Sequence, residues 1–295
     1  MQHNRSAAPG RKEWDREALD RAFSTFAGME GGNPAAAVWI CDAMPLFLGM
    51  PLPLALQGRP EPDAWDAAYR RRHAHLLPRW QTHYRIARVM ASARAAALPP
   101  GRSLMSAPDY FHRHLYAPRG WEFKLNLFPL PERLDAALPW TKVFAEQPEL
   151  RSRPAFLRLC REGGRFRFLH GLRQRHRPRV LLCLGERHRH DYLRAFGFQD
   201  VAGSEAVLQP ADTTHRLQIF QHEGTTLVVA PSFGGVQGLS SDVLLEALGT
   251  FLAQWLRATD FPPLLDEVEQ PGAPAAGPLF PQAAGAVPMH AGAAA

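Results

Sequence analysis

Four polar residues of this chain each stand at or near the end of an apolar run and could take part in chemistry. They are Asp42, Asn126, Glu186 and Ser232. A carboxylate can hold or transfer a proton, a side-chain amide both donates and accepts hydrogen bonds, and a serine hydroxyl can act as a nucleophile beside a base. Such a set favours a ligand-binding or catalytic site if the fold brings the four positions together.

The segments that carry these residues have the length of buried strands, and residues 37–41 also have the two-sided apolar character of a central strand in a parallel sheet. We expect strands at residues 37–41, 123–128, 179–184 and 226–230. Helical periodicity between them completes an alternating pattern of strands and helices, which is typical of an α/β fold. Ligands of open α/β sheets bind at the carboxyl ends of the strands, so the four ends could converge on one pocket.

Apolar residues recur at helical spacing in several other segments. These predict helices at 14–26, 63–98, 134–144, 154–176, 187–196 and 239–256. Prolines from Pro45 to Pro62 predict a long irregular loop, and such loops within compact domains tend to be functional. Residues 217–220 are expected to form a hairpin with the last strand.

The length of 295 residues accommodates one α/β domain with terminal extensions. We expect a flexible N-terminus at 1–12, a single domain at 13–265 and a disordered tail at 266–295. From Gln270 onward the sequence is mostly alanine, glycine and proline with almost no charge, which is typical of a disordered tail.

The formal net charge is +6, and nearly all the cations are arginine, whose planar guanidinium suits phosphate contacts. A nucleic-acid partner is therefore one interpretation. Arginine-rich and alanine-rich composition is also what a high-GC coding bias produces, and the two interpretations stay open.

The three cysteines, Cys41, Cys160 and Cys183, are widely spaced and form no C-x-x-C motif. This pattern is typical of reduced core residues in a cytoplasmic protein and gives no support for a metal site or an iron–sulfur cluster. No run of eighteen apolar residues occurs, so a membrane span is not expected. No cofactor is expected either.

In their order along the chain, the strand-end segments resemble those of the uracil-DNA glycosylase superfamily. The matching segments are Cys41-Asp42-Ala43-Met44-Pro45, Leu125-Asn126-Leu127-Phe128-Pro129, Arg179 to Glu186, and Ala230-Pro231-Ser232. The resemblance spans roughly residues 31–256 and implies a three-layer α/β/α sandwich with a short, mainly parallel central sheet. It also implies recognition of a nucleobase or nucleic acid, with hydrolysis of a glycosidic bond as a further activity to test.

The resemblance assigns roles to individual residues. Asp42 would position or activate water, and Asn126 would read the edge of a base. The family's last loop carries a histidine that stabilises the departing base anion, but Ala230 stands in its place and cannot donate a hydrogen bond. Efficient catalysis of the usual kind is therefore not expected. The other residues predicted to contact the base are Met44, Pro45, Phe128, Pro231 and Ser232.

Structural roles are the alternative for each of these positions. Asn126 could tie down a loop, Asp42 could cap a turn or a helix, and Phe128 could belong to the core. The corresponding alternative for the whole protein is a non-catalytic interaction or regulatory protein that keeps the fold.

Two further patterns remain. The sequence Ala230-Pro231-Ser232-Phe233-Gly234 is one substitution from the nucleophile elbow of α/β-hydrolases, which makes a serine hydrolase with Ser232 a third hypothesis. The only histidine downstream is His290, in the predicted tail. Arg187 and Arg189 open the helix after the third strand and are predicted to contact phosphate, although a solvated helix start would look the same.

Overall fold

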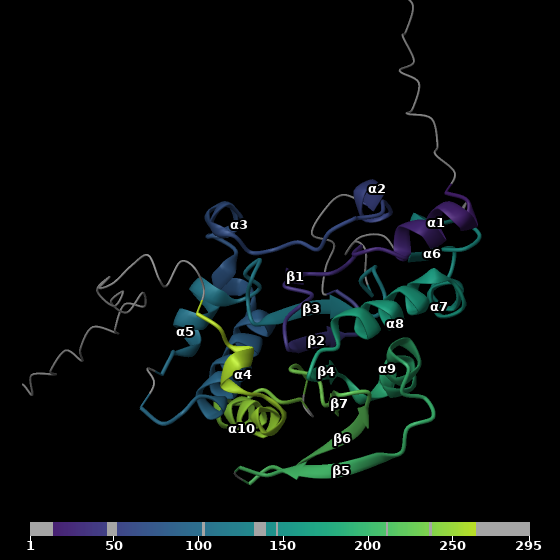
Figure 1. Cartoon of the computed structure of the whole chain (residues 1–295). Helices are drawn as coiled ribbons and strands as arrows, with labels where there is room; N and C mark the ends of the chain where they lie inside the picture. The colour runs from purple at the N-terminus through teal and green to yellow at the C-terminus, as the bar shows by residue number, and fades with distance from the viewer. Residues whose placement is uncertain are drawn as a thin grey trace, which may run out of the picture. The chain divides into compact units, whose positions relative to one another are not determined.

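The fold is built on a seven-stranded sheet in the computed structural model, which describes residues 14–45, 52–101, 104–132, 140–145, 147–210, 212–235 and 238–263 (Figure 1). The predicted flexible N-terminus and the predicted tail lie outside these ranges. The described residues up to Pro262 belong to one compact unit. None of the helices in these ranges has the length and apolar character that a membrane span needs.

The strand order is β1-β3-β2-β4-β7-β6-β5. The four central strands pair in parallel and are β3 (Glu122–Asn126), β2 (Val38–Asp42), β4 (Val180–Leu184) and β7 (Thr225–Ala230). These are the four strands that the apolar runs predict, so the parallel core is confirmed. The flanking strands are antiparallel and are β1 (Gly31–Gly32), β6 (His215–His222) and β5 (Gly203–Leu208).

The sheet is therefore mixed, and two of its flanking strands were not predicted. Strand β5 is mostly exposed at the edge of the sheet and lacks a buried apolar run. Strand β1 consists of two glycines, which are more typical of a loop than of a strand. The predicted hairpin is confirmed, since β6 pairs with β7 across a turn at Glu223-Gly224.

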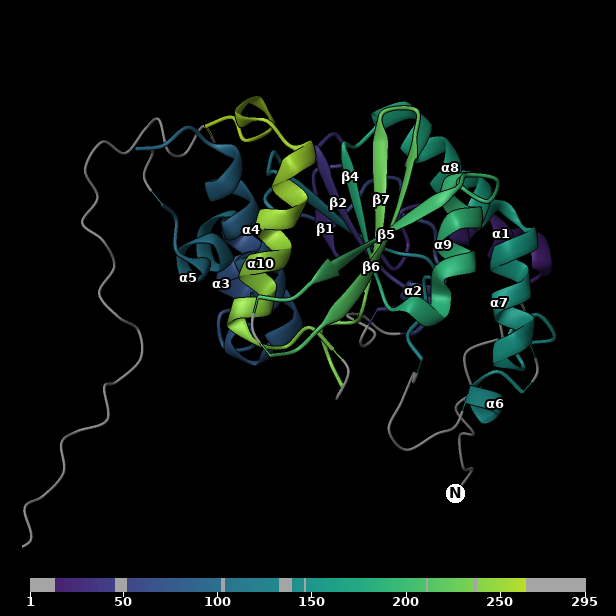
Figure 2. The same ribbon diagram turned by 90° about the horizontal axis from the view of Figure 1, so that it is seen from below.

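Helices cover both faces of the sheet (Figure 2). One face carries α4 (Gln81–Ala97) and α10 (Asp242–Leu252). The close approach of these two helices requires glycine at position 249, because a Cβ atom there would lie 2.3 Å from the Val89 carbonyl oxygen. The other face carries α1 (Arg16–Phe23), α7 (Arg153–Glu162), α8 (Gly164–His176) and α9 (Arg189–Phe196).

Two of the long predicted helices are divided. The segment 63–98 forms α3 (Ala67–His73), a 3-10 turn at Leu77–Arg79 and then α4, since Pro78 interrupts the backbone hydrogen bonding. The segment 154–176 divides at Gly163, where a Cβ atom would lie 2.1 Å from the Asp20 carboxylate. The remaining short helices and turns are α2 (Leu52–Ala55), α5 (Ala107–Asp109), a π turn (Tyr110–His114), α6 (Trp140–Val143) and 3-10 turns at Glu186–His188, Ala253–Trp255 and Ala258–Asp260.

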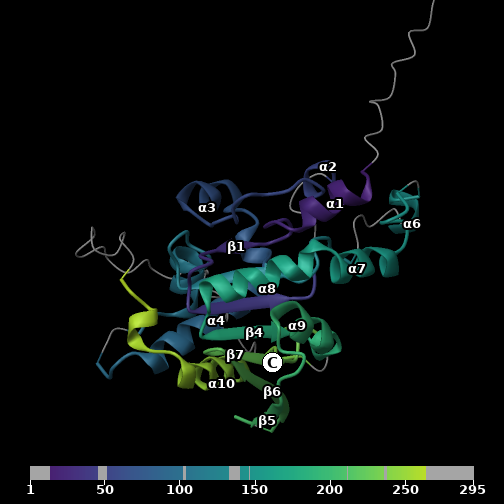
Figure 3. The same ribbon diagram turned by 45° about the vertical axis from the view of Figure 1, so that its right-hand side comes forward.

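Strand β3 has one apolar and one polar face, although every residue in it is buried. Side chains alternate along a strand, so Phe123 and Leu125 enter the main apolar core under α1, α7, α8 and α9. Glu122, Lys124 and Asn126 lie on the opposite face, where buried polar groups need partners. In Figures 1 and 3, α2 and α3 lie beside β1 at this edge of the sheet.

Candidate functional site

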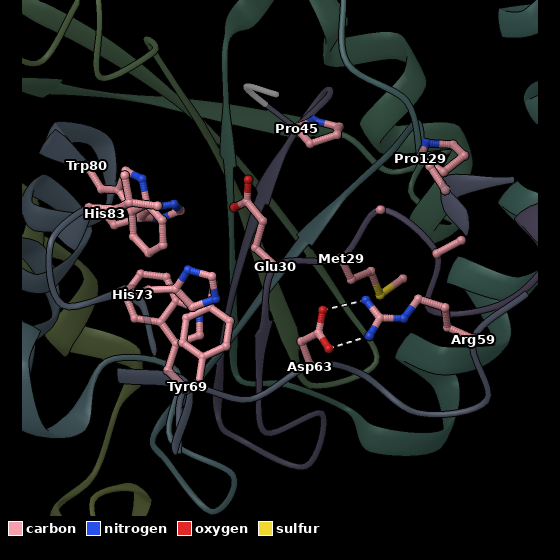
Figure 4. Close-up of a pocket in the computed structure, with 15 residues that line it drawn as sticks. Met29, Glu30, Pro45, Arg59, Asp63, Tyr69, His73, Trp80, His83 and Pro129 are labelled. Carbon is pink, nitrogen blue, oxygen red and sulfur yellow. Dashed lines mark hydrogen bonds and ion pairs between the residues drawn. The ribbon is translucent and has the colours of Figure 1, made fainter. Parts of the chain in front are cut away.

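A cavity of about 260 Å³ lies near β1, between the loop that precedes this strand and the α3 region (Figure 4). Glu30 projects into it between two walls. One wall, called here the aromatic wall, consists of Trp65, Tyr69, His73, Trp80 and His83. The opposite side is formed by Met29, the ion pair of Arg59 with Asp63, and Pro129, with Pro45 at a further edge.

The aromatic wall is a continuous set of ring contacts. Tyr69 stacks on Trp65 with the ring centroids 5.4 Å apart and 16° between the planes. His73, one helical turn after Tyr69 in α3, lies 4.3 Å from its ring, and Trp80 lies 5.2 Å from Trp65. The wall therefore offers the stacking surface that a planar ligand needs.

Arg70 fixes the start of α3 beneath this wall. Its guanidinium donates hydrogen bonds to the backbone carbonyls of Trp65, Phe111 and Leu115. The run Arg70-Arg71-Arg72-His73 has a sequence pattern that is typical of a solvated helix face. Arg71 and Arg72 are exposed, but Arg70 is bonded inward and His73 lines the cavity.

Glu30 belongs to a cluster, called here the carboxylate–lysine cluster, that also contains Lys124 and Asp42. The Nζ atom of fully buried Lys124 is 2.9 Å from Glu30 Oε2 and 2.9 Å from Asp42 Oδ2. The same Nζ atom is 3.3 Å from Asn126 Oδ1. One ammonium group thus forms ion pairs with two carboxylates, that of Asp42 in β2 and that of Glu30 in the loop before β1.

The cluster sets the charge that the cavity presents. Burial opposes ionisation of all three groups. For Lys124 the attraction of Asp42 and Glu30 outweighs burial and raises its pKa above the ordinary lysine value. Burial would raise the pKa of Glu30, but Lys124 outweighs it and holds that pKa below the usual glutamate value. Burial raises the pKa of Asp42. Glu30 is therefore ionised at neutral pH.

The loop that carries Glu30 is clamped to the end of β3. Asn126 Nδ2 donates to the Gly28 carbonyl at 2.7 Å. Gly28 has a φ of +68°, and a Cβ atom there would lie 2.3 Å from the Pro129 carbonyl oxygen, so the close approach requires glycine. Arg165, fully buried in α8, holds the loop from below. Its guanidinium donates to the carbonyls of Phe23, Thr25, Ala27, Asn126 and Leu127.

His83 stands in the aromatic wall as a neutral side chain. Burial lowers its pKa to about 4, so the imidazole carries no charge at neutral pH. Its Nδ1 atom lies 3.1 Å from the Tyr116 hydroxyl, and its ring meets Trp65 edge-on. It adds a polar but uncharged group to an otherwise aromatic surface.

Glu122, two residues before Lys124 in β3, gives the fold a measurable pH dependence. Its carboxyl accepts hydrogen bonds from the Tyr110 hydroxyl and the Tyr116 backbone N–H, yet burial raises its pKa to about 7. The folded protein therefore keeps a proton that the unfolded chain, with the ordinary glutamate pKa of 4.5, has lost. The stability that this proton contributes is present at low pH and is lost as pH rises through 7.

We expect the stability of the wild type relative to Glu122→Gln to fall by about 2–3 kcal/mol between pH 5 and pH 8. Urea denaturation of both proteins at a series of pH values measures this difference. Glu162→Gln, at an exposed position, is the matched control and should show no such trend. A difference between wild type and Glu122→Gln that stays constant with pH would show that Glu122 ionises normally.

The predicted site residues are only partly brought together. Asp42 and Asn126 are neighbours in the parallel register of β2 and β3 and meet at Lys124. Neither lines the cavity, and Asn126 is fully buried. Of the predicted base contacts, only Pro45 lines the cavity.

The other predicted base contacts lie elsewhere. Phe128 is fully buried in the main core, 5.8 Å from the Phe166 ring, which corresponds to the structural alternative. Met44 packs against the same core, with its sulfur 3.2 Å from an Arg153 nitrogen. Pro231 and Ser232 follow β7 and do not line this cavity. The segments after β2 and β3 reach this cavity through Pro45 and Pro129, and a pocket shared by all four strand ends stays a prediction.

The hydrolase and phosphate hypotheses gain no geometric support. Ser232 is exposed, and its hydroxyl donates to the Gly234 carbonyl at 2.9 Å; His290 lies outside the described residues. Arg187 lies 3.5 Å from Glu132, and Arg189 lies 3.3 Å from the Gln218 side-chain oxygen. Neither arginine lines the cavity, and phosphate binding by them stays a prediction. Within the described ranges no three potential metal ligands are grouped.

Sequence reasoning missed Glu30 and Lys124, the centre of the cluster. A signal existed for Lys124, because a lysine in a strand that is predicted to be buried needs a partner for its charge. The aromatic wall gives no distinct sequence signal, since aromatic residues at helical spacing are equally typical of a helix packed on the core.

In comparisons with known proteins, no family model, no curated protein and no solved structure matches this chain. The relationship to the uracil-DNA glycosylase superfamily therefore stays a prediction. What the structure defines is an α/β protein with a mixed sheet, a parallel core and the cavity described above.

Proposed function

We propose that this protein recognises a nucleobase, bound in the cavity between the aromatic wall and the Arg59–Asp63 pair. The observation that carries the proposal is the combination of stacked aromatic rings with an ionised carboxylate at the base of one small cavity. Stacking of a base on an aromatic side chain is worth about 1–3 kcal/mol. The volume of about 260 Å³ lies close to the lower limit of small-ligand pockets, which suits one base.

The base could come from a free nucleoside or from a nucleic acid. Arg71, Arg72 and Arg79 are exposed on the segment that carries the aromatic wall, where they could contact phosphates. Such contacts release counterions, so binding of a nucleic acid would weaken with salt whereas binding of an uncharged nucleoside would not. The two sources are therefore separable by experiment.

Recognition is proposed without efficient cleavage. Ala230, which stands in place of the family's histidine, has no side-chain donor, Asp42 is already held by Lys124, and neither residue lines the cavity. Coverage of the parallel core by helices on both faces supports the three-layer α/β/α sandwich that the resemblance implies (Figure 2). A distant member of the uracil-DNA glycosylase superfamily that binds a base is the function class we propose.

Trp80→Ala is expected to weaken the binding of a nucleoside about tenfold or more, because it removes part of the stacking surface. Isothermal titration with guanosine, adenosine, cytidine and uridine measures this effect. Trp255→Ala is the matched control, since Trp255 is also partly buried but lies in the turn after α10 and does not line the cavity.

Two further experiments separate binding of a free nucleoside, binding of a nucleic acid and glycosidic cleavage. Single-stranded DNA titrated at two salt concentrations tests for a nucleic-acid source, and uracil-containing DNA followed by alkaline treatment tests for an abasic product. If no nucleoside and no DNA binds, the nucleobase proposal is abandoned and the non-catalytic interaction protein remains. Accumulation of abasic DNA would instead show that the protein is a glycosylase.

A further inference from the structure

The charged side chains around the cavity favour a positive ligand. Among the described residues that line it, Arg59 is the single permanent cation, and both its Nη atoms bond to Asp63. Burial lowers the pKa of His83 to about 4 and also lowers the pKa of His73, so neither imidazole is charged at neutral pH. The Glu30 carboxylate forms no ion pair with any described residue of the lining.

The positive partner of Glu30 lies outside the cavity lining. Lys124 is fully buried, and its Nζ atom is 2.9 Å from Glu30 Oε2, which is itself buried. The Glu30 side chain as a whole is 19% exposed and projects into the cavity (Figure 4). A ligand in the cavity is therefore nearer to the negative end of this ion pair than to its positive end. Coulomb's law then favours a cation over a neutral ligand.

The aromatic wall attracts the same kind of ligand. An aromatic ring is negative over its face, so it binds a cation that lies within about 6 Å of its centre, and tryptophan does so most strongly. Tyr69 and Trp80 are both partly exposed, and their ring centroids are 6.5 Å apart. Figure 4 shows these two rings on one side of Glu30, so that one ligand can meet the rings and the carboxylate together.

From these contacts we propose that the base bound in the cavity is positively charged, as alkylation of a ring nitrogen makes it. The proposal rests on the proposed function and specifies its ligand class. An alkylated base keeps the flat ring that stacks on the aromatic wall and adds a charge that the wall and Glu30 both attract. Uracil, the base that the resemblance would suggest, is neutral and lacks this second attraction.

Two pairs of isomeric nucleosides test the role of charge without a change in composition. The nucleosides 1-methyladenosine and 3-methylcytidine are cations at neutral pH, whereas their isomers N6-methyladenosine and 5-methylcytidine are neutral. In isothermal titration of the wild type at pH 7, we expect the cation of each pair to bind about tenfold or more tightly than its neutral isomer.

Glu30→Gln tests whether Glu30 contributes to this preference. The amide keeps the shape of the side chain and removes its negative charge, so the ratio of the two affinities in each pair should fall severalfold towards one. Glu61→Gln is the matched control, because Glu61 is exposed and does not line the cavity. Thermal unfolding of both variants shows whether a change in affinity reflects loss of fold.

The failures of the two proposals are distinguishable. If nucleosides bind but each neutral isomer binds as tightly as its cation, the inference is overturned and the proposed function stands. An unchanged ratio in folded Glu30→Gln would also overturn it. Tetramethylammonium that binds as tightly as 1-methyladenosine would overturn it as well, because the cavity would then recognise a cation without a base. If no nucleoside, charged or neutral, binds to the wild type, the proposed function itself fails.

Discussion

Replacing Lys124 with methionine is expected to lower the free energy of unfolding at pH 7.5 by about 3–5 kcal/mol. Methionine has a similar length, so the loss comes chiefly from charge. Glu30 and Asp42 would each lose the ammonium group that lies 2.9 Å away in the wild type. Two neighbouring carboxylates would then be left in a largely buried place without a counterion, which is one of the costliest single changes a fold can suffer.

The pH dependence of this loss has a definite sign. Without Lys124, burial and mutual repulsion raise the pKa of Glu30 and Asp42 above the unfolded values, so the folded variant takes up protons that the unfolded chain lacks. Its stability is then greatest at low pH and falls as pH rises. Urea denaturation at pH 5 and pH 8 should show a smaller deficit relative to the wild type at pH 5.

Lys142→Met is the matched control, because Lys142 is exposed in α6. Adding Glu30→Gln and Asp42→Asn to Lys124→Met should recover part of the loss by removing both unpaired charges. A Lys124→Met protein as stable as Lys142→Met at both pH values would contradict the role assigned to the carboxylate–lysine cluster.

A loss of similar size, about 3–5 kcal/mol, is expected for Arg165→Met. The side chain is fully buried, and burial lowers its pKa to about 10, which still leaves it charged at neutral pH. Its hydrogen bonds go to five backbone carbonyls, and methionine would leave these acceptors without a donor. Arg165→Lys should recover only part of the loss, since an ammonium lacks the planar fork of a guanidinium.

Because three of those carbonyls belong to the segment 23–27, Arg165→Met should also loosen the loop that positions Glu30. Chemical denaturation gives the overall loss, and hydrogen exchange of the backbone amides at 26–30 reports the loop. Arg167→Met is the control, since the Arg167 side chain lies in the same helix and is 73% exposed. Equal stability and equal hydrogen exchange in the two variants would contradict the role of Arg165 in holding this loop.

The sequence could predict the parallel core because β2, β4 and β7 are largely apolar runs of strand length, and β3 alternates apolar and polar residues over a similar length. It could not predict β5, whose residues are largely exposed and whose pairing with β6 depends on tertiary structure. Local periodicity also predicts that the helices at 63–98 and 154–176 continue through Pro78 and Gly163. At these points a proline and a close helix contact decide where each helix ends.

The candidate site was predicted in part for a comparable reason. Asp42 and Asn126 stand at strand ends, and the sequence shows this directly. Glu30 enters the cavity because the loop before β1 packs on Pro129, about a hundred positions away in the chain. No spacing rule reveals such a contact. The aromatic wall has the same pattern as a buried helix face, and only the cavity in front of it distinguishes the two.

The three free cysteines give the protein built-in reporters of its own opening. Cys41, Cys160 and Cys183 are all fully or nearly fully buried, so a thiol reagent cannot reach them while the fold is closed. Cys41 adjoins Asp42 in β2, whereas Cys160 lies in α7, five residues before Arg165. All three belong to the apolar core between the sheet and the helices α1, α7, α8 and α9. The labelling rate of each thiol therefore measures how often its own part of that core opens, without any engineered probe.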